Sequence, residues 1–141
     1  MAHSFSESYE IRGKDFLEAG NVSTEIKRLL KELGVNREIV RRVAIATYEA
    51  EMNVVMYARE ATVTVELTPN LIRIVVDDRG PGIPDVTLAM QEGYSTATAE
   101  MREMGFGAGM GLPNIKRNAD KFNIGSVVGK GTRLDIVVNI N

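Results

Sequence analysis

The first half of the chain carries apolar residues at helical spacing. Between residues 15 and 33 this pattern predicts an amphipathic helix, with Gly34 as its C′ residue. Asn36 is a good N-cap for a second helix that reaches Tyr57, with an apolar stripe at Ile39, Val43, Ala46, Ala50 and Val54. A weak alternation over residues 6–12 predicts an edge strand before both helices.

Alternation with a period of two follows the second helix. Residues 62–67 and 71–76 predict two strands joined by a turn at residues 68–70. Residues 77–84 hold two glycines and two prolines and predict a loop, and a short helix is expected at residues 85–91. The two strands therefore form a hairpin that leads into a loop.

The last third of the chain begins with residues 93–109, which are rich in glycine and have little periodicity, so we expect a long loop there. A third helix is predicted at residues 110–119, then a hairpin of strands 122–128 and 132–140 around a turn at residues 129–131. This order predicts an α+β fold. We expect one domain over residues 1–141, a two-layer sandwich whose mixed, mostly antiparallel sheet carries helices on one face.

Composition narrows the function classes. The 141 residues include 17 Lys and Arg against 19 Asp and Glu, a net charge of −2, which argues against direct DNA binding. The absence of cysteine excludes disulfides, zinc–thiolate sites and a cysteine nucleophile. No apolar run approaches the roughly 18 residues that span a bilayer, and the polar N-terminus lacks a signal-peptide pattern. We therefore expect a cytoplasmic protein without membrane association.

Glu49 and Asn53 lie four residues apart on the second helix, so their side chains share one face. A carboxylate there can accept a proton from a hydroxyl or water, and an amide oxygen can bind Mg²⁺. Taken alone, the pair fits a solvated polar face that includes Glu51 more simply than a catalytic site. The functional reading depends on the rest of the chain.

Two further segments could contact a ligand. Asp78 directly follows a predicted strand and could accept a hydrogen bond from an exocyclic amine such as that of adenine, while Gly80 and Gly82 would let backbone approach a flat ring. A simple Pro-Gly turn explains the same residues equally well. Residues 105–112 place glycine at every second position before a helix, which favours an anion site over a flexible hinge.

Two common phosphate-binding motifs are excluded. The spacing of residues 125–131 does not match a P-loop, and no glycine follows at position 112, as a dinucleotide-binding motif would need. Residues 129–132 are most simply a hairpin turn.

The order of these segments resembles the four conserved boxes of the GHKL ATP-binding superfamily, over roughly residues 6–140. Those boxes correspond to Glu49 with Asn53, to residues 78–82, to the glycine-rich loop that ends at Gly111, and to Gly131 with Thr132. Residues 78–85, 93–96 and 111–117 resemble more narrowly the stand-alone anti-sigma-factor and switch-protein serine/threonine kinases. The resemblance implies the Bergerat, histidine-kinase-like ATPase fold.

The resemblance also implies a role for each site residue. Asn53 would bind Mg²⁺, Glu49 would be the general base, and Asp78, supported by Thr132, would bind the adenine amine of ATP. The nucleotide would further contact Gly80, Gly82, Ile83, Gly107, Gly109, Met110, Gly111 and Leu112, and residues 93–108 would form the ATP lid. The chain departs from the family pattern in an extended lid at residues 97–104, which includes Arg102, and in Tyr57, where some relatives have histidine.

Three functions remain open. The first is a kinase that phosphorylates a STAS-type antagonist and so controls a sigma factor or a phosphatase. The second is a binding module whose partner affinity is switched by nucleotide, without significant phosphorylation. The third is the catalytic domain of a histidine kinase. A homodimer through the edge strand at residues 6–12 is a further expectation.

Overall fold

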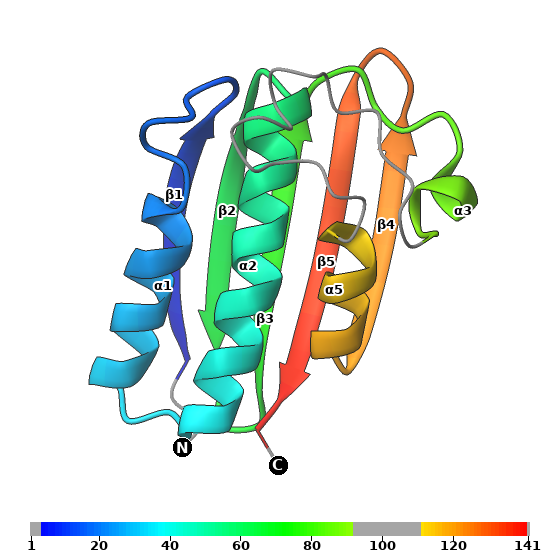
Figure 1. Ribbon diagram of the computed structural model, residues 1–141. Helices are drawn as coiled ribbons and strands as arrows, with labels where there is room; N and C mark the ends of the chain where they lie inside the picture. Colours follow the sequence, from blue (N-terminus) through cyan, green and yellow to red (C-terminus); the bar gives the residue numbers. More distant parts are fainter. Residues whose placement is uncertain (1–3, 92–110, 141) are drawn as a thin grey trace.

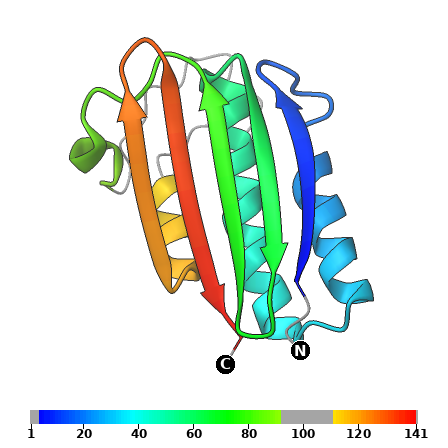
Figure 2. The ribbon, with the colours of Figure 1, turned by 180° about the vertical axis from the view of Figure 1, so that it is seen from behind.

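The computed structural model describes residues 4–91 and 111–140, which form two layers: a five-stranded sheet with helices packed on one face (Figures 1 and 2). The elements follow one another as β1 Phe5–Arg12, α1 Asn21–Glu32, α2 Arg37–Tyr57, β2 Glu60–Leu67, β3 Leu71–Arg79, α3 Val86–Ala89, α5 Gly111–Asn118, β4 Lys121–Val127 and β5 Gly131–Asn139. The predicted α+β sandwich is confirmed.

The strand order is β1-β2-β3-β5-β4, and each of the four pairings among the described residues is antiparallel. The sheet is therefore more uniformly antiparallel than the expected mixed sheet. β1 lies at one edge, as predicted, and β4 at the other. Figure 2 shows that the helices among residues 4–91 and 111–140 leave the far face of the sheet uncovered. Polar side chains occupy much of that face, among them the pair Arg73 and Asp135.

The core lies between the sheet and the helices. Alternate residues of the central strands face the helices and are buried, among them Val63, Val65, Ile72, Ile74, Leu134 and Ile136. Val43, Ala46, Ala50 and Val54 of α2 are buried as the predicted stripe requires, while Ile39 is only partly buried. Burying a branched aliphatic side chain contributes about 1.5–3 kcal/mol, so this interface supplies most of what holds α2 to the sheet.

α1 is shorter than the predicted helix at residues 15–33, because it begins only at Asn21. Gly20 precedes it with φ +98°, a left-handed conformation that interrupts the helix. The first turn of α1 is capped by Glu51 of α2, whose carboxylate accepts hydrogen bonds from three backbone N–H groups. Glu51 is 2% exposed, so its expected place on a solvated polar face is wrong.

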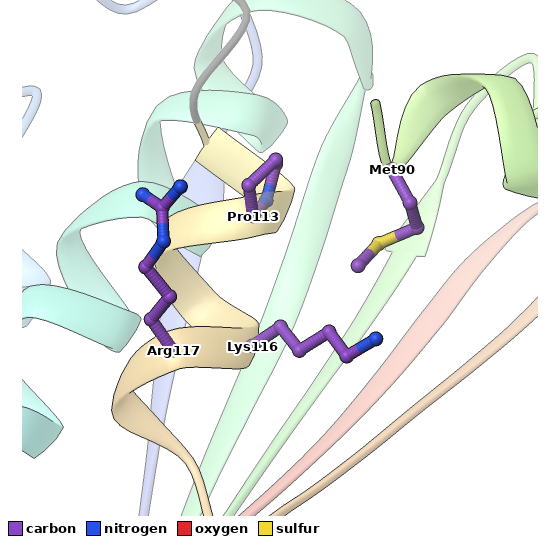
Figure 3. Close-up of a pocket in the computed structure, with 4 residues that line it drawn as sticks. All are labelled: Met90, Pro113, Lys116 and Arg117. Carbon is purple, nitrogen blue, oxygen red and sulfur yellow. The ribbon is translucent and has the colours of Figure 1, made fainter. Parts of the chain in front are cut away.

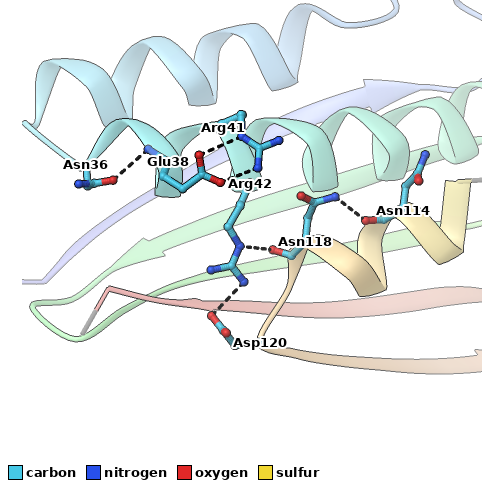
Figure 4. Close-up of polar contacts among 7 residues, drawn as sticks. All are labelled: Asn36, Glu38, Arg41, Arg42, Asn114, Asn118 and Asp120. Atoms are coloured by element: carbon cyan, nitrogen blue, oxygen red, sulfur yellow. Dashed lines mark hydrogen bonds and ion pairs between the residues drawn. The ribbon is translucent and has the colours of Figure 1, made fainter.

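α2 begins and ends where the sequence predicts. The Asn36 side chain accepts a hydrogen bond from the Glu38 N–H at 2.9 Å (Figure 4), and Gly34 adopts φ +80° after α1. β3 continues through Arg79, so the predicted loop at 77–84 begins only at Gly80. α3 is shorter than expected and is capped by Asp85.

The predicted loop at residues 93–109 and position 110 of the third predicted helix lie outside the described residues. Within the described residues, α5 and the hairpin of β4 and β5 follow the prediction closely. Among the described helices, none combines the length and the apolar composition that a membrane span requires.

Candidate functional site

The structure brings Glu49 and Asn53 of α2 against the first residue of α5. A Cβ atom built on Gly111 would lie 3.3 Å from Glu49 Oε2 and 3.5 Å from Asn53 Oδ1. A side chain at position 111 would therefore be in contact with both polar groups, and the Glu49 carboxylate would have to shift by a few tenths of an ångström to accommodate it. Glu49, Asn53 and Gly111, which the sequence analysis assigned to one site, lie together.

The Glu49 carboxylate is partly buried, and its pKa is raised above the ordinary value because burial disfavours the charged form. A hydrogen bond from the Asn114 side chain opposes this shift by stabilising the ionised form. A raised pKa makes the ionised carboxylate a stronger proton acceptor. Sequence reasoning did not identify Asn114, although it lies one helical turn after Gly111.

α5 is held against α2 by further polar contacts, which Figure 4 shows. Arg42 Nε donates to the Asn118 carbonyl at 3.2 Å and its Nη2 lies 3.3 Å from Asp120 Oδ2. Asn118 in turn donates from its side chain to the Asn114 carbonyl at 2.9 Å. These contacts fix the position of α5 along the axis of α2. They therefore also fix the position of Gly111 beside Glu49.

Asn53 offers an uncharged oxygen beside this carboxylate. It is partly buried, and within the described residues its side chain makes no hydrogen bond that would occupy that oxygen. Mg²⁺ commonly takes one or two protein oxygens and fills its shell with water and phosphate oxygens. The donor set at Asn53 therefore fits a magnesium ion that arrives with a phosphate ligand.

Asp78 forms the second part of the site, at the end of β3. Its Oδ1 accepts a hydrogen bond from the Thr132 backbone N–H at 2.9 Å. Burial raises the pKa of Asp78, and this hydrogen bond partly opposes the shift. A Cβ on Gly131 would lie 2.0 Å from the Asp78 carbonyl oxygen, and its φ of +155° also favours glycine. The Asp78–Thr132 pairing implied by the resemblance is thus present as a backbone contact.

Ser126 of β4 joins the segment after Asp78 to the start of β5. Its Oγ accepts from the Ile83 N–H at 2.7 Å and lies 2.9 Å from Thr132 Oγ1 and 3.2 Å from the Gly131 carbonyl oxygen. Backbone bonds between Gly80 and Lys130, and between Gly129 and Pro81, also join the two segments. The sequence analysis missed Ser126; its signal was a small polar residue at a helix-facing position of a strand.

The remaining predicted site residues fall into two groups, those that the structure describes and those that lie outside the described residues. Leu112 is buried in the first turn of α5, and Gly80, Gly82 and Ile83 follow Asp78 as expected. Figure 1 shows that α2 and β3 end, and β5 begins, at the same end of the sheet. Gly107, Gly109 and Met110, together with the extended lid at residues 97–104, lie outside the described residues.

An open cleft of about 400 Å³ is lined by Met90, which follows α3, and by Pro113, Lys116 and Arg117 of α5. Figure 3 shows Lys116 and Met90 extending toward each other across it, while Arg117 points along the helix. Arg117 donates to the Asn114 side-chain oxygen at 3.1 Å. The cleft thus combines an apolar wall with basic side chains.

Comparison with known proteins gives consistent matches. The family model described as the histidine kinase-like ATPase domain matches residues 17–138. The serine/threonine-protein kinase RsbT of Bacillus subtilis is 32% identical over 115 residues, covering 79% of this chain and 80% of that protein. The anti-sigma F factor of Caldanaerobacter subterraneus subsp. tengcongensis is 32% identical over 114 residues, with 77% and 76% covered. The anti-sigma F factor of Thermoanaerobacter sp. (strain X514) is 30% identical over 114 residues, covering 77% of this chain and 76% of that protein.

Proposed function

Because this chain belongs to the histidine kinase-like ATPase domain family, we propose that it is an ATP-binding serine/threonine protein kinase of the anti-sigma-factor type. The observation that carries the proposal is the meeting of Glu49 and Asn53 with the first turn of α5. A carboxylate with a raised pKa, a neutral amide oxygen and a glycine helix start are the groups that phosphoryl transfer needs: a base, a metal ligand and space for phosphate.

Each residue has a proposed role. Asp78 accepts a hydrogen bond from the adenine amine, and Gly80, Gly82, Ile83, Leu112 and Thr132 surround the nucleotide. Gly107, Gly109 and Gly111 would lie over the phosphates, Met110 would contact the nucleotide, and Asn53 would hold Mg²⁺, which would neutralise charge on the phosphate oxygens. Glu49 accepts the proton of the attacking serine or threonine hydroxyl. The hydroxyl oxygen then forms a bond to the γ-phosphorus of ATP. The bond between the γ-phosphorus and the oxygen that bridges to the β-phosphate breaks, and ADP leaves.

The partner is proposed from the same family membership. The hydroxyl substrate is a STAS-type antagonist protein, and the kinase thereby regulates a sigma factor or a phosphatase in the cytoplasm, without binding DNA itself. Residues 1–141 act as one ATP-binding domain, and the exposed edge of β1 offers a surface for a homodimer.

The test compares wild type with Glu49→Ala and with Glu66→Ala, a control on an exposed glutamate of β2. Purified protein is incubated with Mg²⁺, radiolabelled ATP and a STAS-type partner, and ATP affinity is measured separately by calorimetry. We expect Glu49→Ala to lose transfer at least a hundredfold while still binding ATP, with Glu66→Ala unchanged, since a general base contributes about 10²–10⁴-fold.

Intact transfer by Glu49→Ala would refute the assigned base. ATP binding without transfer by wild type, under any partner condition, would favour the nucleotide-switched binding module. Label on a histidine of the partner would favour a histidine-kinase catalytic domain.

A further inference from the structure

Ser126 makes three polar contacts, and its single proton constrains how they are arranged. A serine hydroxyl donates one hydrogen bond and accepts two. The Ile83 N–H, at 2.7 Å, can only donate to it, and the Gly131 carbonyl oxygen, at 3.2 Å, can only accept from it. Ser126 therefore gives its proton to Gly131 when all contacts are satisfied.

The remaining contact is with the Thr132 hydroxyl, at 2.9 Å, in which either oxygen could be the donor by distance alone. In the arrangement that satisfies all three contacts, the Ser126 proton goes to Gly131 and Thr132 donates to the second lone pair of Ser126. Thr132 is 7% exposed, so few other partners compete for its proton. Its oxygen then offers only lone pairs to any neighbouring ligand.

Asp78 adds further acceptors to the same place. One carboxylate oxygen accepts from the Thr132 backbone N–H at 2.9 Å, and the second makes no hydrogen bond within the described residues. Because the Thr132 backbone is hydrogen-bonded to Asp78, the Asp78 carboxylate and the Thr132 hydroxyl oxygen belong to neighbouring groups, and together they supply an acceptor-only surface to a base bound beside them. Such a surface suits an amine, which donates, and disfavours a carbonyl oxygen, which would meet lone pairs on both sides.

We propose that Ser126 is a specificity-determining residue, which commits the Thr132 hydroxyl proton and so makes the base subsite select a 6-amino purine over a 6-oxo purine. The inference rests on the proposed nucleotide site and concerns its selectivity. When Ser126 is absent, the Thr132 hydroxyl is released to turn and donate to a 6-oxo group. Selectivity then falls, although Asp78 still accepts from an amine.

The test measures binding and needs no catalysis. Calorimetry with Mg²⁺ gives the affinities of ATP and of inosine triphosphate, which differ only in the 6-amino or 6-oxo group, for wild type and for Ser126→Ala. We expect the ratio of the two affinities to fall about tenfold in Ser126→Ala, mainly through tighter binding of inosine triphosphate, which is the size of one hydrogen bond. Ser126→Thr keeps a hydroxyl and is expected to keep the wild-type ratio.

A double variant distinguishes two causes of a lower affinity ratio in Ser126→Ala: release of the Thr132 hydroxyl proton, and a general loosening of the loop. Ser126→Ala with Thr132→Val has no hydroxyl left to turn, so the ratio is expected to return toward the wild-type value; a ratio that stays low would refute the proposal. An unchanged ratio in Ser126→Ala would also overturn it, while leaving the kinase proposal intact. Wild type that binds neither nucleotide would instead refute the nucleotide site itself.

Discussion

Glu51 is a buried carboxylate whose removal can be evaluated from its contacts. It accepts hydrogen bonds from the N–H groups of Gly20 and Val22, each at 3.1 Å, and of Ser23, at 2.8 Å. These groups are at the start of α1, where backbone N–H groups have no partner within the helix. Glu51 therefore caps α1 from a different helix and fixes α1 to α2.

Three hydrogen bonds, at the net value of about 1–1.5 kcal/mol for an ordinary intramolecular bond, give about 3–4.5 kcal/mol for Glu51→Ala. Glu51→Gln keeps the shape and one accepting oxygen, so we expect it to lower the free energy of unfolding by about 2 kcal/mol. Both are large fractions of the 5–15 kcal/mol that is usual for a domain. The same exchange at the exposed Glu25 of α1, Glu25→Gln, is expected to cost less than about 0.5 kcal/mol.

Urea denaturation at pH 7, followed by circular dichroism, measures these differences at constant m-value. The reasoning is refuted if Glu51→Gln unfolds within about 0.5 kcal/mol of wild type, because the three N–H groups would then have equivalent partners elsewhere. A changed m-value would instead show that α1 had detached as a separate unit, which also contradicts a single cooperative cap.

Three further outcomes are expected. Asp78→Asn should weaken ATP binding roughly 10- to 100-fold in calorimetry, because it loses a charge-assisted acceptor; unchanged affinity would remove Asp78 from the base subsite. Gly111→Ala should lower kcat for transfer about tenfold with little loss of stability, since its Cβ would stand 3.3 Å from Glu49 Oε2; equal kcat would show that the carboxylate yields freely. The pKa of Asp135 is lowered by Arg73, so the folded protein binds this proton less readily than the unfolded chain does. Relative to Asp135→Asn, wild type should therefore gain at most about 1 kcal/mol above about pH 4 and lose it as the pH falls further; an advantage that grew in acid would contradict this sign.

The long helix α2 and the strands of the two hairpins were predictable from the sequence. α2 has an N-cap at Asn36 and a continuous apolar stripe, and the four later strands alternate clearly, so local signals and tertiary packing agree. The start of α1 was not predictable in this way. Its cap comes from Glu51, about 30 positions later in the chain, and a helical apolar pattern upstream of Gly20 concealed the break.

The candidate site was predictable only in part. Each segment taken alone had a simple structural explanation, but Glu49, Asn53 and Asp78 stood out through their order along the chain, which resembles the boxes of the GHKL superfamily. Asn114 and Ser126 did not, because a polar residue on a short helix or near a hairpin is common, and its importance depends on which atoms lie opposite. Sequence periodicity assigns a residue to a face, whereas proton donors and acceptors are matched only in three dimensions.

Glu49 and Glu51 place two carboxylates with different roles on nearly opposite sides of α2, one beside α5 and the other beside α1. Successive residues turn by about 100° around a helix, so inserting or deleting one residue between Arg37 and Glu49 would rotate everything beyond it relative to the rest of α2. Glu49 would leave α5, and Glu51 would leave the start of α1, in a single step. α2 is thus constrained in its rotational phase, because a change in the number of residues between Arg37 and Glu49 would separate both carboxylates from their partners.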